Sequence, residues 1–214
     1  MFEKNATICF QGDSITDGGR GRDGDLNHTM GHGYAYLIAS RVGYEQPEQQ
    51  YNFLNRGISG NRIVDLYARW QEDTLNLKPD VLSILIGVND VGMEFSQACG
   101  VSAAKYEKVY TSLIDETKSQ FPNITIVICE PFILPVGYVK DNWKQWYQEV
   151  SQRQEAAKRI SEAYGTIYVP LQESFNDACR QADESYWIWD GVHPTPAGHA
   201  LIANQWLDNV MNRK

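Results

Sequence analysis

The stretch that decides the fold is residues 7–17, Thr7-Ile8-Cys9-Phe10-Gln11-Gly12-Asp13-Ser14-Ile15-Thr16-Asp17. Its first four residues form an apolar run that is long enough for a buried strand and too short for a helix. The run ends in Gly12, and polar residues follow it at once. We therefore expect a strand over residues 7–10 that leads directly into a polar turn.

Four further segments have the character of strands. Residues 81–86 and 124–129 are apolar runs bounded by proline or glycine, and residues 51–54 and 166–169 are weaker candidates. Runs of this length without polar alternation are typical of strands that are buried on both faces of a sheet.

Amphipathic helices are predicted between these strands. Apolar side chains recur at helical spacing over residues 106–117 and again over residues 146–164. The second of these helices is expected to begin near Asp141 or Asn142, either of which can accept backbone N–H groups, and to stop at Gly165.

The alternation of strands and helices ends with a helix over about residues 197–212. Continuous apolar strands that alternate with amphipathic helices predict an α/β fold, with a parallel sheet covered on both faces. A chain of 214 residues with no internal repeat or linker is expected to form one domain over residues 1–214.

Net charge and apolar content limit the classes of binding partner and the cellular compartment that we expect. The formal net charge of −8 disfavours a nucleic-acid partner or an anionic membrane, because phosphate groups would be repelled. No apolar stretch is long enough for a signal peptide or a membrane span, so we expect a cytoplasmic protein. Two of the four cysteines, Cys9 and Cys129, lie in apolar strand-like runs, which favours buried thiols over disulfides or a metal site.

Four segments that follow the strands, or precede the last helix, carry polar residues suited to catalysis. They contain Ser14 after the first strand, Gly60 after the second, Asn89 after the third, and Asp190 with His193 before the last helix. In a parallel sheet the reactive crevice lies outside the carboxyl ends of the strands. We therefore expect these residues to meet at one edge.

The residue types match nucleophilic catalysis. The hydroxyl of Ser14 needs a neighbouring base, and His193, which has a carboxylate three residues upstream and lies just before the last helix, is the candidate. That carboxylate, Asp190, would fix the imidazole tautomer and stabilise its cation. Pro194 biases His193 away from helical geometry, as a loop requires.

Attack on an ester carbonyl also creates an oxyanion that needs hydrogen-bond donors. The backbone N–H groups of Ser14 and Gly60 and the side-chain amide of Asn89 are the candidates. A glycine at position 60 suits this role because it allows substrate to approach the backbone closely.

Plainer roles compete with these assignments. Ser14 alone would be an ordinary helix cap, and Asn89 alone an ordinary turn residue. Asp13 is expected to hold the loop by hydrogen bonds. For Trp189, a pocket wall and a core position are equally favoured, so it is only a candidate substrate-binding residue.

Two glycine motifs are rejected as functional signatures. Residues 19–24 satisfy the dinucleotide pattern G-x-G-x-x-G but begin too far after the strand, so a loop is expected. Residues 57–60 lack one residue of the G-x-S-x-G nucleophile elbow. His28 and His32 suggest a metal only weakly because the glycines around them disfavour a preformed site, and we predict none.

The glycine-rich stretch over residues 18–33 starts just beyond Ser14. A loop of this length is uncommon without a function, so it is a candidate for a pocket wall or an oligomer contact. Arg20 and Arg22 would bind sugar hydroxyls there or a neighbouring subunit, and the sequence does not decide between the two.

The four polar blocks, taken together, resemble those of the SGNH (GDSL-type) hydrolases, which are named for Ser, Gly, Asn and His in four separate blocks. Gly12-Asp13-Ser14, Gly60, Gly87-Val88-Asn89-Asp90 and Asp190-Gly191-Val192-His193 occur in the family's order. Residues 12–17 with Arg20, together with residues 57–61, 68–73 and 189–194, are most similar to the carbohydrate acetylesterase branch, particularly acetylxylan esterases.

This resemblance implies a three-layer α/β/α, flavodoxin-like fold with five parallel strands, no cofactor, and often a homo-oligomer. It implies deacetylation of acetylated oligosaccharides, with xylo-oligosaccharides expected for a cytoplasmic enzyme. The alternatives are a lysophospholipase or acyl-thioesterase on the same scaffold, and a sugar-binding module that has lost turnover.

Overall fold

The computed structural model describes residues 2–212 and contains a five-stranded sheet with all strands parallel, in the order β2-β1-β3-β4-β5. The strands are β1 (Thr7–Gly12), β2 (Asn52–Asn55), β3 (Val81–Leu85), β4 (Thr125–Cys129) and β5 (Ile167–Val169). All five predicted strands are confirmed. The first runs two residues further than predicted, because its pairing with β3 continues to Gly12 opposite Leu85.

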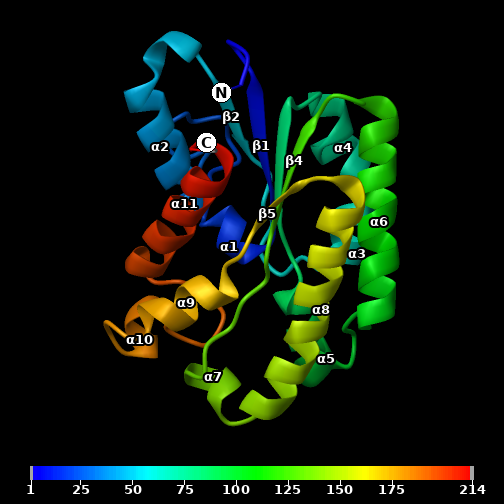
Figure 1. Cartoon of the computed structure of the whole chain (residues 1–214), viewed down its shortest axis with the longest axis vertical. Coiled ribbons are helices and arrows are strands. Elements are labelled where there is room, and N and C mark those ends of the chain that lie inside the picture. Colours follow the sequence, from blue (N-terminus) through cyan, green and yellow to red (C-terminus); the bar gives the residue numbers. More distant parts are fainter. Residues whose placement is uncertain (1, 213–214) are drawn as a thin grey trace.

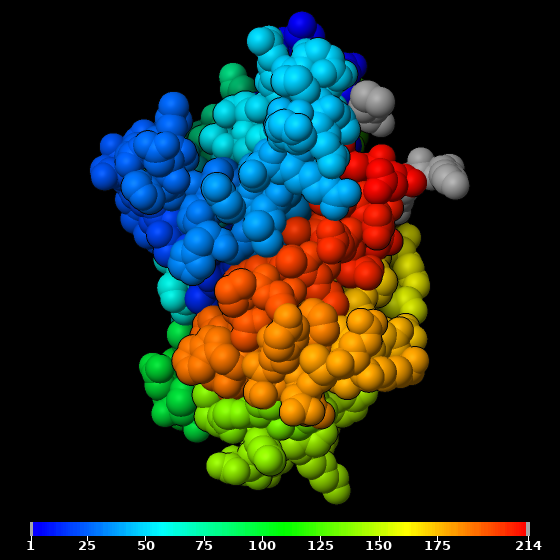
Figure 2. Space-filling model, turned by 90° about the vertical axis from the view of Figure 1, so that its left-hand side faces the viewer, coloured from blue at the N-terminus to red at the C-terminus, as the bar shows by residue number. Residues whose placement is uncertain are grey.

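Helices cover the sheet in two layers, which confirms the three-layer α/β/α architecture (Figure 1). One layer contains α2 (Tyr34–Glu45), α9 (Gln172–Ala178) and α11 (Pro196–Val210), and the other contains α3 (Ile63–Ala68), α4 (Trp70–Asp73), α6 (Ala103–Gln120) and α8 (Trp143–Tyr164). On the face seen in Figure 2, α11 lies between α2 and α9. None of the helices within residues 2–212 is both long and apolar enough to cross a bilayer.

Alternation along the strands supplies both faces of the sheet with apolar side chains. In β1, Ile8 and Phe10 pack into the core beneath α2 and α11, which contains Trp206. Cys9, between them, belongs to the opposite core with Trp70. Because successive side chains of a strand point to opposite faces, one short apolar run serves two separate cores.

Cys9 and Cys129 are buried within their strands, as predicted. Burial raises the pKa of each thiol to about 12, so neither is a reactive thiolate at neutral pH.

The helix ends agree with the predictions in part. Helix α8 stops at Gly165, which adopts the left-handed conformation (φ 61°), as expected. The helix also begins where predicted, with Asn142 as its N-cap, but the side chain of Asn142 makes no capping bond. The short helix α7 (Gly137–Lys140) leads into α8, and the backbone carbonyl of Asn142 accepts the N–H groups of Gln145 and Trp146 instead.

The order of the strands determines where ligands bind. The chain leaves β1 for β2 on one side and later crosses to β3 on the other, so β1 and β3 flank the point where the winding reverses. In open α/β sheets the binding crevice lies at this point, beyond the carboxyl ends of the strands. The short helices α1 (Ser14–Asp17) and α5 (Val88–Gln97) follow these two strands, and α10 (Glu184–Trp187) precedes the block that contains His193.

Candidate active site

The turn between β1 and α1 is held by Asp13 and presents Ser14. The side chain of Asp13 caps α1 by accepting the N–H of Ile15 at 2.9 Å, and Gly18 ends the helix in the left-handed conformation. The predicted structural role of Asp13 is thereby confirmed. Because the side chain of Asp13 caps the helix, the hydroxyl of Ser14 is available for another partner. Burial raises the pKa of Asp13 to about 7.

Ser14, His193 and Asp190 form a continuous hydrogen-bonded chain. The Oγ of Ser14 lies 2.9 Å from Nε2 of His193, and Nδ1 of the same ring lies 2.6 Å from Oδ2 of Asp190. The second carboxylate oxygen of Asp190 accepts the backbone N–H groups of Val192 at 3.0 Å and His193 at 2.8 Å. Residues that are far apart in the sequence therefore meet as the sequence predicts, and the carboxylate is fixed from both sides.

The loop that carries Asp190 and His193 needs a glycine between them. Gly191 has φ 109°, and a Cβ there would lie 2.4 Å from the side chain of Val139. A residue with a side chain would be strained and would push the loop away from α7. The geometry of the pair thus depends on a close approach between two segments.

The charges of this pair support each other. The hydrogen bond that its ring donates to Asp190 raises the pKa of His193 above its ordinary value, although burial acts in the opposite direction. Burial raises the pKa of Asp190, but the hydrogen bonds from the ring and backbone of His193 outweigh it, so the net pKa is lowered. Asp190 is therefore a carboxylate at neutral pH, and it stabilises an imidazolium beside Ser14.

The predicted oxyanion donors are tied to the same edge by hydrogen bonds between loops. Ile58, in the loop after β2, donates its N–H to the carbonyl of Gly12 at 3.1 Å. The side-chain nitrogen of Asn89, in the first turn of α5, donates to the carbonyl of Asn61 at 3.1 Å. One N–H of the Asn89 amide makes this bond, and the other has no acceptor among residues 2–212. Gly60 lies between the two hydrogen-bonded residues Ile58 and Asn61, with φ 82°.

A hollow of about 480 Å³ opens beside Ser14 and His193. Trp189 is one wall of this hollow, and 64% of its surface is exposed. Its ring lies nearly parallel to the imidazole of His193, with ring centroids 6.2 Å apart. The sequence left open whether Trp189 is a pocket wall or a core residue. In the structure it is a pocket wall.

The glycine-rich residues 18–33 supply the opposite wall, including Gly18, Gly19, Arg22 and His32. The pocket-wall alternative for this stretch is thereby confirmed. The G-x-G-x-x-G motif within it lies in turns and bends and opens no helix, as predicted.

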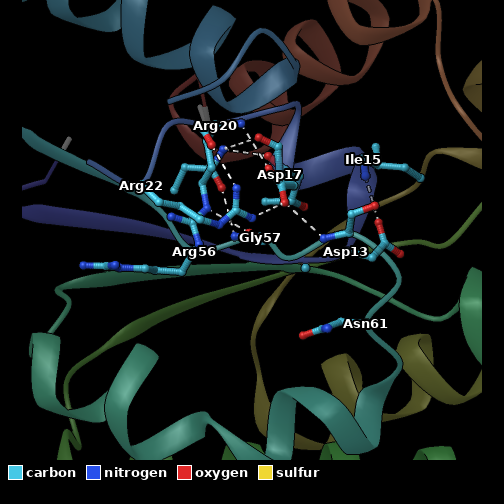
Figure 3. A network of polar contacts seen from close by, with 12 residues as sticks. Asp13, Ile15, Asp17, Arg20, Arg22, Arg56, Gly57 and Asn61 are labelled. Carbon is cyan, nitrogen blue, oxygen red and sulfur yellow. Dashed lines mark hydrogen bonds and ion pairs between the residues drawn. The ribbon is translucent and has the colours of Figure 1, made fainter. Parts of the chain in front are cut away.

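Internal ion pairs and hydrogen bonds hold this wall in place, as Figure 3 shows around Asp17. The carboxylate of Asp17 accepts Nη2 of Arg22 at 2.6 Å, the N–H of Arg20 at 3.0 Å and the N–H of Ser59 at 3.1 Å. Nε of Arg20 donates to the carbonyl of Gly57 at 2.8 Å. Both arginines thus fasten the loop, and half-exposed Arg22 also reaches the hollow.

His199, to which no sequence pattern pointed, also lines the hollow. It lies in the first turn of α11, and its Nδ1 accepts the N–H of Tyr34, the first residue of α2, at 3.1 Å. Burial lowers the pKa of His199 to about 4, so the ring is neutral at pH 7. Its spacing gave no signal, because the residue it contacts is in a helix distant in sequence.

Comparison with known proteins gives a family match over most of the chain. Residues 10–201 match the model of the GDSL-like lipase/acylhydrolase family. A curated relative, an acetylxylan esterase from Geobacillus stearothermophilus, is 34% identical over 210 residues, covering 95% of this chain and 93% of its own.

Solved structures agree with this match. A putative GDSL-like lipase from Parabacteroides merdae superimposes with a TM-score of 0.95 at 38% identity, covering 100% of this chain and 99% of its own. The acetylxylan esterase Axe2 from Geobacillus stearothermophilus superimposes with a TM-score of 0.87 at 32% identity, covering 97% and 95%.

Three of the Axe2 structures are of variants described as catalytic mutants, in which a serine, an aspartate or a histidine is replaced by alanine. The three replaced positions have the same spacing along that chain as Ser14, Asp190 and His193 have along this one.

Proposed function

Because this chain belongs to the GDSL-like lipase/acylhydrolase family and is a carboxylic ester hydrolase, we propose that it is a carbohydrate acetylesterase acting on xylo-oligosaccharides. The observation that carries the proposal is the chain from Ser14 through His193 to Asp190, with contacts of 2.9 and 2.6 Å at the carboxyl edge of the sheet. In this proposal Ser14 is the nucleophile.

The first half of the reaction acylates Ser14. Nε2 of His193 takes the hydroxyl proton while Oγ attacks the acetyl carbon, and the carbonyl electron pair moves onto the oxygen. The N–H groups of Ser14 and Gly60 and the free amide N–H of Asn89 hold this oxyanion. The intermediate collapses, the bond to the sugar oxygen breaks, and His193 gives its proton to the departing alkoxide.

The second half removes the acetyl group. A water molecule gives one proton to Nε2 of His193 while its oxygen attacks the acetyl carbon. The second oxyanion collapses, and the proton returns from His193 to Oγ of Ser14. Acetic acid leaves, ionises to acetate in water at neutral pH, and the enzyme is restored. Asp190 stays ionised throughout and stabilises the imidazolium in both halves.

The relatives support the substrate class. The 34% identical curated protein is an acetylxylan esterase, and one Axe2 structure is described as that of an acetyl-xylooligosaccharide esterase. The catalytic substitutions of Axe2 have the spacing of Ser14, Asp190 and His193, which supports the proposed roles of these residues.

The test is Ser14→Ala, assayed with p-nitrophenyl acetate and with acetylated xylobiose. We expect the variant to lose about 10⁴-fold or more in kcat. Ser40→Ala, at an exposed serine of α2, is the matched control and keeps wild-type rates. Retention by Ser14→Ala of more than about one part in a hundred of wild-type turnover rules out Ser14 as the nucleophile.

Longer acyl groups are the second candidate, because the family includes lipases and the Parabacteroides merdae structure is described as a putative lipase. A lysophospholipase or acyl-thioesterase hydrolyses eight-carbon esters faster than acetate, whereas an acetylesterase shows the reverse. A rate that rises from p-nitrophenyl acetate to the octanoate therefore overturns the acetylesterase proposal. Failure of a fluorophosphonate to label Ser14 would instead favour a sugar-binding module without turnover.

A homo-oligomer and a cytoplasmic location stay predictions. Light scattering on the protein as it elutes from a sizing column measures the number of subunits directly.

A further inference from the structure

The side of the active site from which the alcohol leaves follows from the role of His193. In the proposed reaction Nε2 of His193 gives its proton to the departing oxygen, so the alcohol lies on the side of that atom. The hollow of about 480 Å³ opens there, between Trp189 and residues 18–33. Gly60 and Asn89, the other proposed oxyanion donors, do not line it. These proposed oxyanion donors thus lie outside the hollow, which leaves it free to receive the alcohol.

One residue of this hollow presents a donor whose direction is fixed. His199 is only 8% exposed, and the hollow is where it is reached. Its Nδ1 accepts the N–H of Tyr34, and a Cβ built on Gly33 would lie 3.1 Å from its Cε1. Nδ1 and Cε1 therefore face the backbone at the start of α2, and Nε2 is the remaining polar atom of a ring that lines the hollow.

The tautomer of His199 follows from the same contact. A neutral imidazole whose Nδ1 accepts a hydrogen bond carries its proton on Nε2. Burial keeps the ring neutral at pH 7. Among residues 2–212, no group accepts a hydrogen bond from this Nε2–H. The donor is thus available for a ligand.

The remaining charges favour a neutral ligand. Arg22, the cationic side chain at this wall, is paired with the carboxylate of Asp17 at 2.6 Å. Trp189 offers an exposed ring face. A paired charge, a neutral donor and an aromatic face suit the hydroxyl and ether oxygens and the C–H face of a sugar, and they supply no free cation for a phosphate or carboxylate.

We infer that the hollow beside Ser14 binds the sugar that becomes the leaving alcohol, and that Nε2–H of His199 donates a hydrogen bond to one of its oxygens. This inference rests on the proposed function. It adds a specificity residue that acts on the alcohol and not on the acetyl group. Two acetyl esters that differ only in their alcohol therefore separate this role from a general effect on catalysis.

The experiment compares two substitutions of His199 on peracetylated xylobiose and on p-nitrophenyl acetate. In His199→Asn the short amide oxygen can still accept the N–H of Tyr34, but no donor reaches the position of Nε2. In His199→Gln the longer amide nitrogen can reach that position. Gln148→Asn is the control, at an exposed glutamine of α8 outside the hollow and outside residues 18–33.

We expect His199→Asn to lose about tenfold in kcat/KM on the xylobiose ester, mainly through KM, and to change less than about twofold on p-nitrophenyl acetate. His199→Gln is expected to stay within about threefold of wild type on both esters, and Gln148→Asn to match wild type. The melting temperature of each variant reports whether the contact with Tyr34 is kept.

The outcomes are separable. An equal loss on both esters, or an equal loss in His199→Gln and His199→Asn on the sugar, shows a structural role and overturns the inference. No loss in His199→Asn overturns it as well. If wild-type protein hydrolyses p-nitrophenyl acetate but not the acetylated sugar, the proposed substrate class itself is wrong and the inference is overturned with it. If wild type hydrolyses both, only the inference is at stake.

Discussion

The two ends of the sheet carry hollows that differ in size and in chemistry. At the amino ends of the strands, a hollow of about 710 Å³ is lined by residues such as Lys78, Asp80 and Phe121. At the carboxyl ends the hollow measures about 480 Å³ and contains Ser14 and His193. The larger volume lies away from the proposed chemistry, so size alone would have indicated the wrong end.

The difference lies in how the polar groups are connected. At the amino end, the carboxylate of Asp80 accepts the backbone N–H of Thr7 at 2.8 Å and thereby fastens the start of β1. At the carboxyl end, one oxygen of Asp190 likewise accepts backbone N–H groups. Its other oxygen accepts a hydrogen bond from the ring of His193, which in turn contacts the hydroxyl of Ser14. A carboxylate becomes useful for catalysis when it orients a second titratable group toward a nucleophile.

The largest expected effect tests this contrast with one substitution made at both ends. Asp190→Asn should lower kcat on p-nitrophenyl acetate by about 10⁴-fold, because an amide cannot stabilise the imidazolium and favours the wrong tautomer of His193. Asp80→Asn should leave kcat within about twofold, since Asp80 only fastens a strand. A loss smaller than about a hundredfold in Asp190→Asn would remove the asymmetry between the two ends.

A second pair compares side-chain amides. Asn89→Ala should lower kcat by about 10²- to 10³-fold with little change in KM, because the donor acts mainly on the oxyanion of the transition state. Asn123→Ala, in the hollow at the amino end, should change neither constant. Steady-state kinetics on p-nitrophenyl acetate measure both. A rise in KM at constant kcat for Asn89→Ala would mean that the amide binds the ground state instead.

The pH dependence should report the carboxyl end alone. The hydrogen bond that His193 donates to Asp190 raises the pKa of His193, and the ring must be neutral to accept the proton of Ser14. Activity is therefore present above this raised pKa and lost as the pH falls through it. We expect kcat/KM to fall about tenfold per pH unit on the acid side, with a midpoint above about 6.5.

The substitutions above sharpen this pH test. Asp80→Asn should leave the midpoint unchanged. In Asp190→Asn the hydrogen bond that raises the pKa of His193 is weakened, so the residual activity should have its midpoint at lower pH. A wild-type midpoint below about 6.5, the ordinary pKa of a histidine side chain, would contradict the proposed coupling of the two residues.

The smallest expected effect concerns the acyl group. Cε of Met93 lies 3.6 Å from the position that a Cβ on Gly60 would occupy, so this side chain lies beside one of the proposed oxyanion donors. Met93→Ala should raise the ratio of propionate to acetate hydrolysis about fourfold, since making room for one methylene is worth about 0.8 kcal/mol. Met93→Leu, which keeps the volume, should leave the ratio unchanged. An unchanged ratio in Met93→Ala would place the acyl group elsewhere.

Much of the fold and of the candidate site could be predicted from short stretches of sequence. The five apolar runs, such as residues 81–86, became five parallel strands because a run that must be buried on both faces has few other solutions. Ser14 and Asn89 met at one edge because the carboxyl ends of parallel strands point the same way. Asp190 and His193 lie within one turn, so their pairing is nearly local.

What could not be predicted depends on contacts between distant segments. The sequence left the position of Trp189 open, and only the folded chain places its ring beside the imidazole of His193. The sequence left open whether Arg20 and Arg22 bind a sugar or a neighbouring subunit. In the folded chain both residues bind within the protein, to Asp17 and Gly57.

By itself, therefore, the sequence determined the class of fold, the order of its strands along the chain and the residues of the proposed catalytic chain. These follow from strand-length apolar runs and from the polarity of a parallel sheet, both of which are local in origin. Only the tertiary structure decided which walls surround the site and which tautomer His199 adopts. Those features depend on contacts between α2, α11 and the glycine-rich loop. The spacing of residues within a single segment cannot predict such contacts.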